Sequence, residues 1–207
     1  MKSRRQFIAQ AAGITVAAAA GPALGGALVN VANAAEKSDT QTNLPDTQAN
    51  LMDAFAGESQ ANRKYLTFAD QADQEGLPQV ALLFRAIAEA ETIHAKHHLR
   101  SAGKVGNTLD NLKAAMEGEI YEATKMYPEM AKTAAKEGKT QVQEYFKWAD
   151  QVEAGHAELY KKAIAVNGKL DKTDYYLCSQ CGYTHEGKYE DICPVCGADG
   201  SAFYKFA

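Results

Sequence analysis

The chain has 207 residues, with 22 Lys and Arg against 26 Asp and Glu, which gives a formal net charge of −4 at pH 7. An acidic chain is poorly suited to binding nucleic acid or an anionic membrane surface, because both attract basic patches. The length accommodates one domain of ordinary size and a small appendage.

Residues 1–34 predict an export signal. Arg4 and Arg5 stand in "SRRQFI", ahead of an Ala/Gly-rich apolar run and the small-residue sequence "ANA". This order is typical of a signal peptide, and the paired arginines indicate the twin-arginine pathway. An uncleaved membrane anchor is the alternative, although Pro22 and the many small residues argue against it. We therefore expect a periplasmic protein that meets the membrane only through its signal peptide, followed by a flexible leader at 35–45.

The segment 46–168 predicts a four-helix bundle. Four amphipathic stretches of similar length each end at a glycine and are joined by short connectors. The expected helices span 46–76, 77–103, 108–138 and 140–168. Pro128 lies inside the third of these and is expected to kink it.

Each expected helix carries a glutamate on its otherwise apolar face, and two of these glutamates belong to Glu-x-x-His motifs. Four unpaired carboxylates in an apolar bundle would be very costly, so two bound cations are expected. One Glu from each of two helices, with Glu-x-x-His from each of the other two, is the pattern of di-iron carboxylate proteins. The predicted ligands are Glu58, Glu91, His94, Glu119, Glu153 and His156.

The sequence "GEIYE" adds a further acid, Glu122, on the same helix face as Glu119. It is either another metal ligand or a solvated acid, as Glu117 and Glu129 nearby are expected to be. We favour the ligand role because of the shared face. Tyr65 and Tyr127 also fall on the faces that carry the predicted ligands.

The last forty residues contain all four cysteines, as Cys178-x-x-Cys181 and Cys193-x-x-Cys196. Two such loops are typical of a tetrahedral site for one metal ion, and zinc and iron share this geometry. Disulfides are the alternative in an exported protein. Export of an already folded chain argues against them, because the metal can be loaded in the reducing cytoplasm.

With these motifs in place, the chain resembles the rubrerythrin family from about residue 46 to residue 207. The matching stretches are "AFAGES", "AEAETIHA", "GEIYEATKMYPEMAK", "VEAGHAELY", "CSQCGYTHEG" and "CPVCG". The resemblance implies a ferritin-like di-iron bundle at 46–168 joined to a rubredoxin-like Fe(Cys)4 domain at 169–207. An export signal is unusual for this family.

The resemblance also implies roles for individual residues. Glu122 would bind one iron in the oxidised state, and His94 would replace it in the reduced state. Tyr65 and Tyr127 would form hydrogen bonds to ligand carboxylates.

The connector between the second and third expected helices, "AGKVGN", bears on assembly. Ferritin-like bundles run these two helices parallel, which needs a connector of about 30 Å. Six residues span only about 20 Å when fully extended. The helices therefore form either a plain up-down bundle or a homodimer with exchanged helix pairs, and we favour the homodimer.

The expected function is that of a non-haem di-iron peroxidase, which reduces hydrogen peroxide to water with electrons delivered through the rubredoxin-like iron. The electron donor is left open, with a periplasmic redox protein as the candidate. The alternatives are a ferroxidase that handles iron, a di-manganese catalase, and a non-enzymatic metal-binding or sensing protein with zinc at the cysteines.

Overall fold

The computed structural model describes residues 46–189 and 191–206. The predicted export signal and leader therefore lie outside the described residues. Among the residues described, no helix is both long enough and apolar enough to cross a membrane.

The predicted fold class, a helical bundle with a small C-terminal strand domain, is confirmed. Three of the four expected helices are single elements, and the third consists of an α-helix, a π-helical segment and a second α-helix. The helical elements are α2 (Asp46–Gln74), α3 (Pro78–Ser101), α4 (Thr108–Tyr121), η1 (Glu122–Met126), α5 (Tyr127–Lys136) and α6 (Thr140–Ala165).

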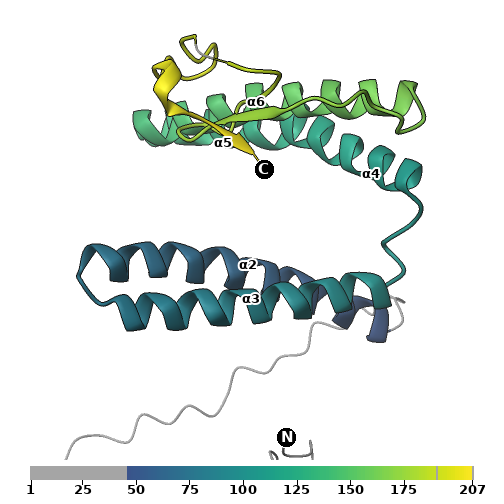
Figure 1. Ribbon diagram of the computed structural model, residues 1–207, viewed down its shortest axis with the longest axis vertical. Coiled ribbons are helices and arrows are strands. Elements are labelled where there is room, and N and C mark those ends of the chain that lie inside the picture. The colour runs from purple at the N-terminus through teal and green to yellow at the C-terminus, as the bar shows by residue number, and fades with distance from the viewer. Residues whose placement is uncertain (1–45, 190, 207) are drawn as a thin grey trace, which may run out of the picture. The chain divides into compact units, whose positions relative to one another are not determined.

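Helices α2 and α3 form an antiparallel pair (Figure 1). The chain turns between them at Gly76, whose φ of 73° favours glycine, and Pro78 begins α3 at a position where its missing N–H leaves no partner unpaired. Asn62 of α2 donates hydrogen bonds to the Ala88 carbonyl at 2.6 Å and to Thr92 Oγ1 at 2.9 Å. These bonds fix the register of the pair.

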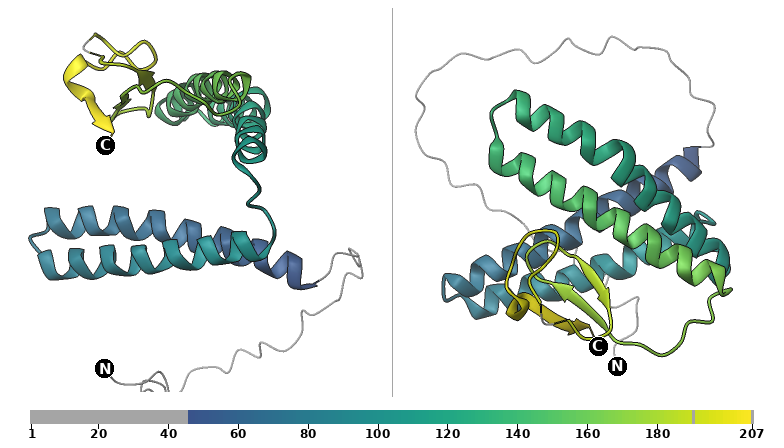
Figure 2. Two further views of the ribbon diagram at one scale, coloured as in Figure 1. Left: turned by 45° about the vertical axis from the view of Figure 1, so that its right-hand side comes forward. Right: turned by 90° about the horizontal axis from the view of Figure 1, so that it is seen from above.

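The second antiparallel pair consists of α4, η1 and α5 packed along α6 (Figure 2). Asn107 caps α4 by accepting a hydrogen bond from the backbone N–H of Asp110. Pro128 was expected to kink this helix. The structure has a π-helical segment that ends two residues before the proline, at Met126, and the Tyr127 N–H bonds the Glu122 carbonyl; the kink itself stays a prediction. Proline lacks an N–H and crowds the preceding turn, and one wider turn accommodates both effects.

The C-terminal domain is a small antiparallel sheet with strand order β2-β1-β3. Its elements are β1 (Tyr175–Cys178), β2 (Thr184–Glu186), the 3-10 turn η2 (Gly200–Ala202) and β3 (Phe203–Phe206). Aromatic rings support it: the ring centroids of Tyr189 and Phe203 are 4.5 Å apart. The domain contacts α6 through β2.

The buried helical residues described by the structure are small. They are alanines and Val152, whereas large apolar side chains such as Leu82, Leu83 and Tyr121 are more than half exposed. The extensive helix packing is that of α2 with α3 and of α4, η1 and α5 with α6. Each helix pair therefore has a face on which large apolar side chains are exposed and are not buried against the rest of the described chain.

Candidate metal centres

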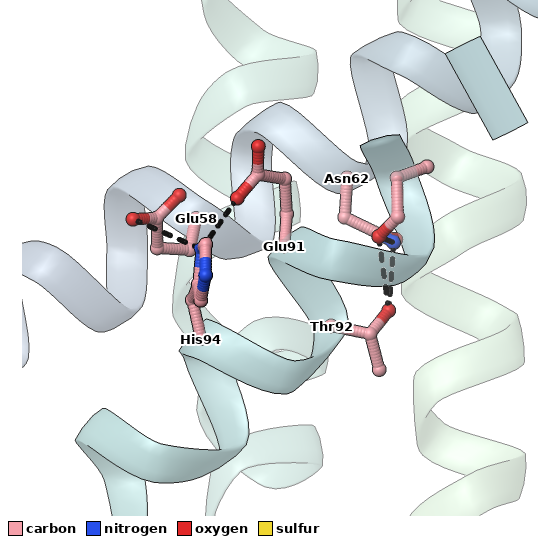
Figure 3. A network of polar contacts seen from close by, with 6 residues as sticks. Glu58, Asn62, Glu91, Thr92 and His94 are labelled. Carbon is pink, nitrogen blue, oxygen red and sulfur yellow. Dashed lines mark hydrogen bonds and ion pairs between the residues drawn. The ribbon is translucent and has the colours of Figure 1, made fainter. Parts of the chain in front are cut away.

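The first half-site consists of Glu58 on α2 and of Glu91 and His94 on α3. Figure 3 shows these three side chains pointing toward one another, and their ligand atoms all lie within 4.8 Å of each other. His94 Nδ1 is 2.8 Å from Glu91 Oε2 and 4.0 Å from Glu58 Oε1. The His94 side chain is 55% exposed.

The second half-site repeats this arrangement with Glu119 on α4 and with Glu153 and His156 on α6. Its ligand atoms also lie within 4.8 Å of each other. His156 Nδ1 is 2.7 Å from Glu153 Oε2 and 4.0 Å from Glu119 Oε2. The His156 side chain is only 26% exposed. The structure thus brings the six predicted ligands together as two groups of three, one on each helix pair.

The electrostatics of the second half-site favour a cation. Burial, and then the negative charge of Glu153, raise the pKa of Glu119, and His156 offsets only part of this shift. Two carboxylates and an imidazole nitrogen also form a donor set that suits iron. The residues of both half-sites therefore fit the metal ions that the sequence predicts.

Glu122 is not in either group of three. It is the first residue of the π-helical segment, and it is half-buried, whereas Glu117 and Glu129 are exposed. Burial, followed by the charges of Glu122, Glu153 and Glu119, raises the pKa of Tyr127. Glu122 therefore lies near the second half-site, and its binding to metal stays a prediction.

The two predicted tyrosines have different surroundings. Burial, and then the charges of nearby carboxylates, raise the pKa of Tyr127, and its ring lies 6.2 Å from that of Phe146. The Tyr65 ring lies 6.2 Å from that of Phe84, and no carboxylate accepts a hydrogen bond from its hydroxyl within the described residues. Within the described residues neither hydroxyl donates a hydrogen bond to a carboxylate, so the predicted roles of Tyr65 and Tyr127 stay predictions.

Two neighbours of the second half-site were not predicted from the sequence. Burial, and then the charges of Glu119 and Glu153, raise the pKa of Tyr160. Its spacing of seven residues from Glu153 on one helix was an available signal. The other is Thr184 of β2, whose Oγ1 lies 3.1 Å from His156 Nε2. No periodicity connects Thr184 with α6, so its position depends on the tertiary structure.

The cysteine site brings all four thiols together, and none forms a disulfide. The Sγ atoms of Cys178 and Cys196 are 3.7 Å apart, and those of Cys181 and Cys193 are 3.6 Å apart. A tetrahedral ion with metal–sulfur bonds of about 2.3 Å would place its sulfurs about 3.8 Å apart. The four thiols are therefore arranged to bind one metal ion.

The loops of this site have the backbone conformation that such binding requires. Gly182 and Gly197 have φ values of 85° and 74°, and their N–H groups bond the carbonyls of Cys178 and Cys193. Burial disfavours the thiolate of Cys193, but hydrogen bonds from the N–H groups of Cys196 and Val195 and from the neighbouring thiols outweigh it and lower the pKa of Cys193, whereas burial raises the pKa of Cys181 and Cys196. This backbone stabilises a negatively charged sulfur ligand.

Comparison with known proteins supports the same two-part organisation. Residues 49–164 match the family model described as Rubrerythrin, and residues 176–204 match the one described as Rubrerythrin, rubredoxin-like domain. Rubrerythrin-2 of Clostridium acetobutylicum is 32% identical over 173 residues, which cover 75% of this chain and 94% of the relative.

Two further relatives extend the comparison. Nigerythrin of Nitratidesulfovibrio vulgaris is 33% identical over 181 residues, which cover 81% of this chain and 90% of the relative. Rubrerythrin of Porphyromonas gingivalis is 36% identical, with coverage of 72% and 84%. A solved structure of nigerythrin in a partially reduced state is 32% identical, covers 82% of this chain and 91% of its own, and has a TM-score of 0.48.

Proposed function

The chain belongs to the rubrerythrin family, with a di-iron site of Glu and His residues and a rubredoxin-like site of four cysteines, and from this premise we propose that it reduces hydrogen peroxide to water. The observation that carries the proposal is the presence of both sites in one chain. A storage protein or a catalase has no need of an attached one-electron carrier, whereas a peroxidase needs electrons in every turnover.

The reaction consumes one peroxide, two electrons and two protons and yields two waters. Iron, when bound, would supply the electrons. The residues of the chain hold and orient the ions: Glu153 and His156 come from one helix, and Glu119 faces them from another. The Tyr127 hydroxyl is protonated at neutral pH, and its raised pKa further favours that form, so it can donate a hydrogen bond beside these carboxylates.

In this proposal Glu122 and His94 alternate as ligands of one iron. Ferric iron is the harder ion and favours an anionic oxygen, whereas ferrous iron accepts imidazole. His94 is the more exposed of the two histidines, which leaves its side chain room to move.

We further propose that two chains form the di-iron centre by exchanging helix pairs. Each helix pair holds three ligands, and the connector between α3 and α4 consists of residues 102–107, too short for a parallel run of these helices. The large exposed apolar side chains, such as Leu82 and Leu83, would become buried against a second copy. The first half-site of one chain would then face the second half-site of its partner.

Residues 1–34 underlie a proposal about location. We propose twin-arginine export to the periplasm, where a periplasmic redox protein would serve as electron donor. Replacement of Arg4 and Arg5 by Lys should retain the protein in the cytoplasm, as measured by cell fractionation. Periplasmic accumulation of that variant would contradict the proposal.

The proposed activity is tested by stopped-flow oxidation of the anaerobically reduced, metal-quantified protein, by peroxide and separately by dioxygen. Fast oxidation by peroxide and slow oxidation by dioxygen, with about three irons per chain, is the expected result. Comparable or faster oxidation by dioxygen, or zinc at the cysteines of native material, would instead favour a ferroxidase.

A further inference from the structure

Thr184 connects the rubredoxin-like domain to the second half-site. Its hydroxyl oxygen lies 3.1 Å from His156 Nε2, while the other ring nitrogen, Nδ1, faces Glu153 and Glu119. We propose that Thr184 is a positioning residue, which holds the His156 ring in the orientation and tautomer that present Nδ1 to a metal ion. The inference rests on metal binding at this half-site and not on the substrate proposed above.

The hydrogen bonds around Thr184 are consistent with a hydrogen on His156 Nε2. The Thr184 hydroxyl donates its one hydrogen to the Gly182 carbonyl at 3.2 Å. It can then accept a hydrogen bond from His156, which requires the hydrogen on Nε2. In the metal-free protein Nδ1 donates a 2.7 Å hydrogen bond to Glu153 Oε2, and a bound cation would take the place of that hydrogen, so that Nδ1 presents its lone pair to the metal.

The histidine of the first half-site lacks such an anchor. His94 has partners at Nδ1 only, and within the described part of the chain nothing forms a hydrogen bond with its Nε2. Its side chain is also about twice as exposed as that of His156 (55% against 26%). Thr184 therefore makes the two half-sites unequal, with His156 held in place and His94 left free to reorient.

The same hydrogen bonds link the cysteine site to His156. Gly182 directly follows Cys181, so the route runs from Cys181 through the Gly182 carbonyl and the Thr184 hydroxyl to the imidazole ring. These residues would connect iron held by the cysteines with iron held at His156, and the two irons, when bound, would supply the one-electron chemistry.

A cavity of about 400 Å³ borders Thr184, Glu119, His156 and Tyr160. A truncation such as Thr184→Ala would enlarge this space, and a water molecule could then replace the hydroxyl. Thr184→Val is the sharper variant, because it keeps the side-chain shape and removes only the hydrogen bonds. Thr184→Ser keeps the hydroxyl and serves as the conservative comparison.

The experiment uses the full chain with iron at the cysteines, whose unchanged visible absorption reports an intact domain. Titration with Co²⁺ measures affinity at the carboxylate–histidine sites, and NMR of the Zn²⁺-loaded protein measures exchange of the His156 Nε2 proton. We expect Thr184→Val to weaken binding of one of the two Co²⁺ ions by about 10- to 100-fold. Exchange of the Nε2 proton should also become faster.

Thr184→Ser should behave like the unmodified chain, as should Thr173→Val, a matched control outside the sheet. Wild-type affinity and exchange in Thr184→Val would overturn the proposal. Equal losses in Thr184→Val and Thr184→Ser would also overturn it, since they would indicate a packing effect and not a hydrogen bond. Both outcomes are independent of whether peroxide is the substrate.

Discussion

At the residue scale, Glu122 has the most specific proposed role. Glu122→Ala should leave iron binding largely intact, because the six other predicted ligands remain, and should slow peroxide turnover by about tenfold or more. Iron content and steady-state turnover are the two measurements. Glu129→Ala is the matched control, since Glu129 is an exposed acid on the same predicted helix. Unchanged turnover in Glu122→Ala would mean that Glu122 is only a surface acid.

Replacing Glu119 should stabilise the metal-free protein and weaken its binding of iron. Because burial and Glu153 raise the pKa of Glu119, its ionised carboxylate destabilises the metal-free fold at neutral pH. Glu119→Gln removes this charge and should raise the melting temperature of the metal-free protein while weakening iron binding. Thermal unfolding with and without iron tests both effects. A lower melting temperature of the metal-free variant would show that the carboxylate has a stabilising partner.

The effect of Glu119 should also depend on pH. Its folded-state pKa is raised, so the folded metal-free protein binds the proton more tightly than the unfolded chain does. The stability advantage of the protonated form is present at acid pH and is lost as the pH rises through the raised value. The difference in melting temperature between Glu119→Gln and the unmodified protein should therefore shrink below the usual pKa of a glutamate.

At the scale of elements, the sequence predicted the helices well and their local irregularities poorly. The helix expected at 140–168 is α6, which ends at Ala165 because Asn167 and Gly168 adopt positive φ values. The six ligands could be predicted because helix periodicity places each of them on the apolar face of its own helix. The contact between Thr184 and His156 could not be predicted, because it depends on how the C-terminal domain docks on α6.

The π-helical segment gives a prediction at this scale. It begins at Glu122, and π-helical turns are frequent at functional sites because they shift one side chain relative to its neighbours. Pro128→Ala restores a backbone N–H and permits a regular α-helix. We expect unchanged helix content by circular dichroism, equal or higher stability, and slower turnover, because Tyr127 and the residues after it rotate relative to Glu119 and Glu122. Turnover equal to that of the unmodified chain would show that the π-helical turn has no functional role.

At the scale of the whole molecule, the proposed exchange of helix pairs predicts complementation between two inactive variants. Glu91→Ala damages the first half-site, and Glu153→Ala damages the second. In an exchanged dimer of one variant with the other, one centre combines both damaged half-sites and the other centre combines both intact ones. If each centre were instead formed within one chain, every centre in the mixture would be damaged.

Co-expression of the two variants with different affinity tags therefore distinguishes the two assemblies. Random pairing makes about half of the dimers hybrid, each with one intact centre of two, so about a quarter of the normal iron sites and turnover should return. Each variant expressed alone provides the baseline. Tandem purification on both tags selects the hybrid dimers, and these should have about half of the normal iron sites and turnover. Hybrids without recovered iron or turnover would contradict the exchange. A metal-loaded protein that sediments as a monomer at low micromolar concentration would contradict it independently, since a single chain would then bind both ions.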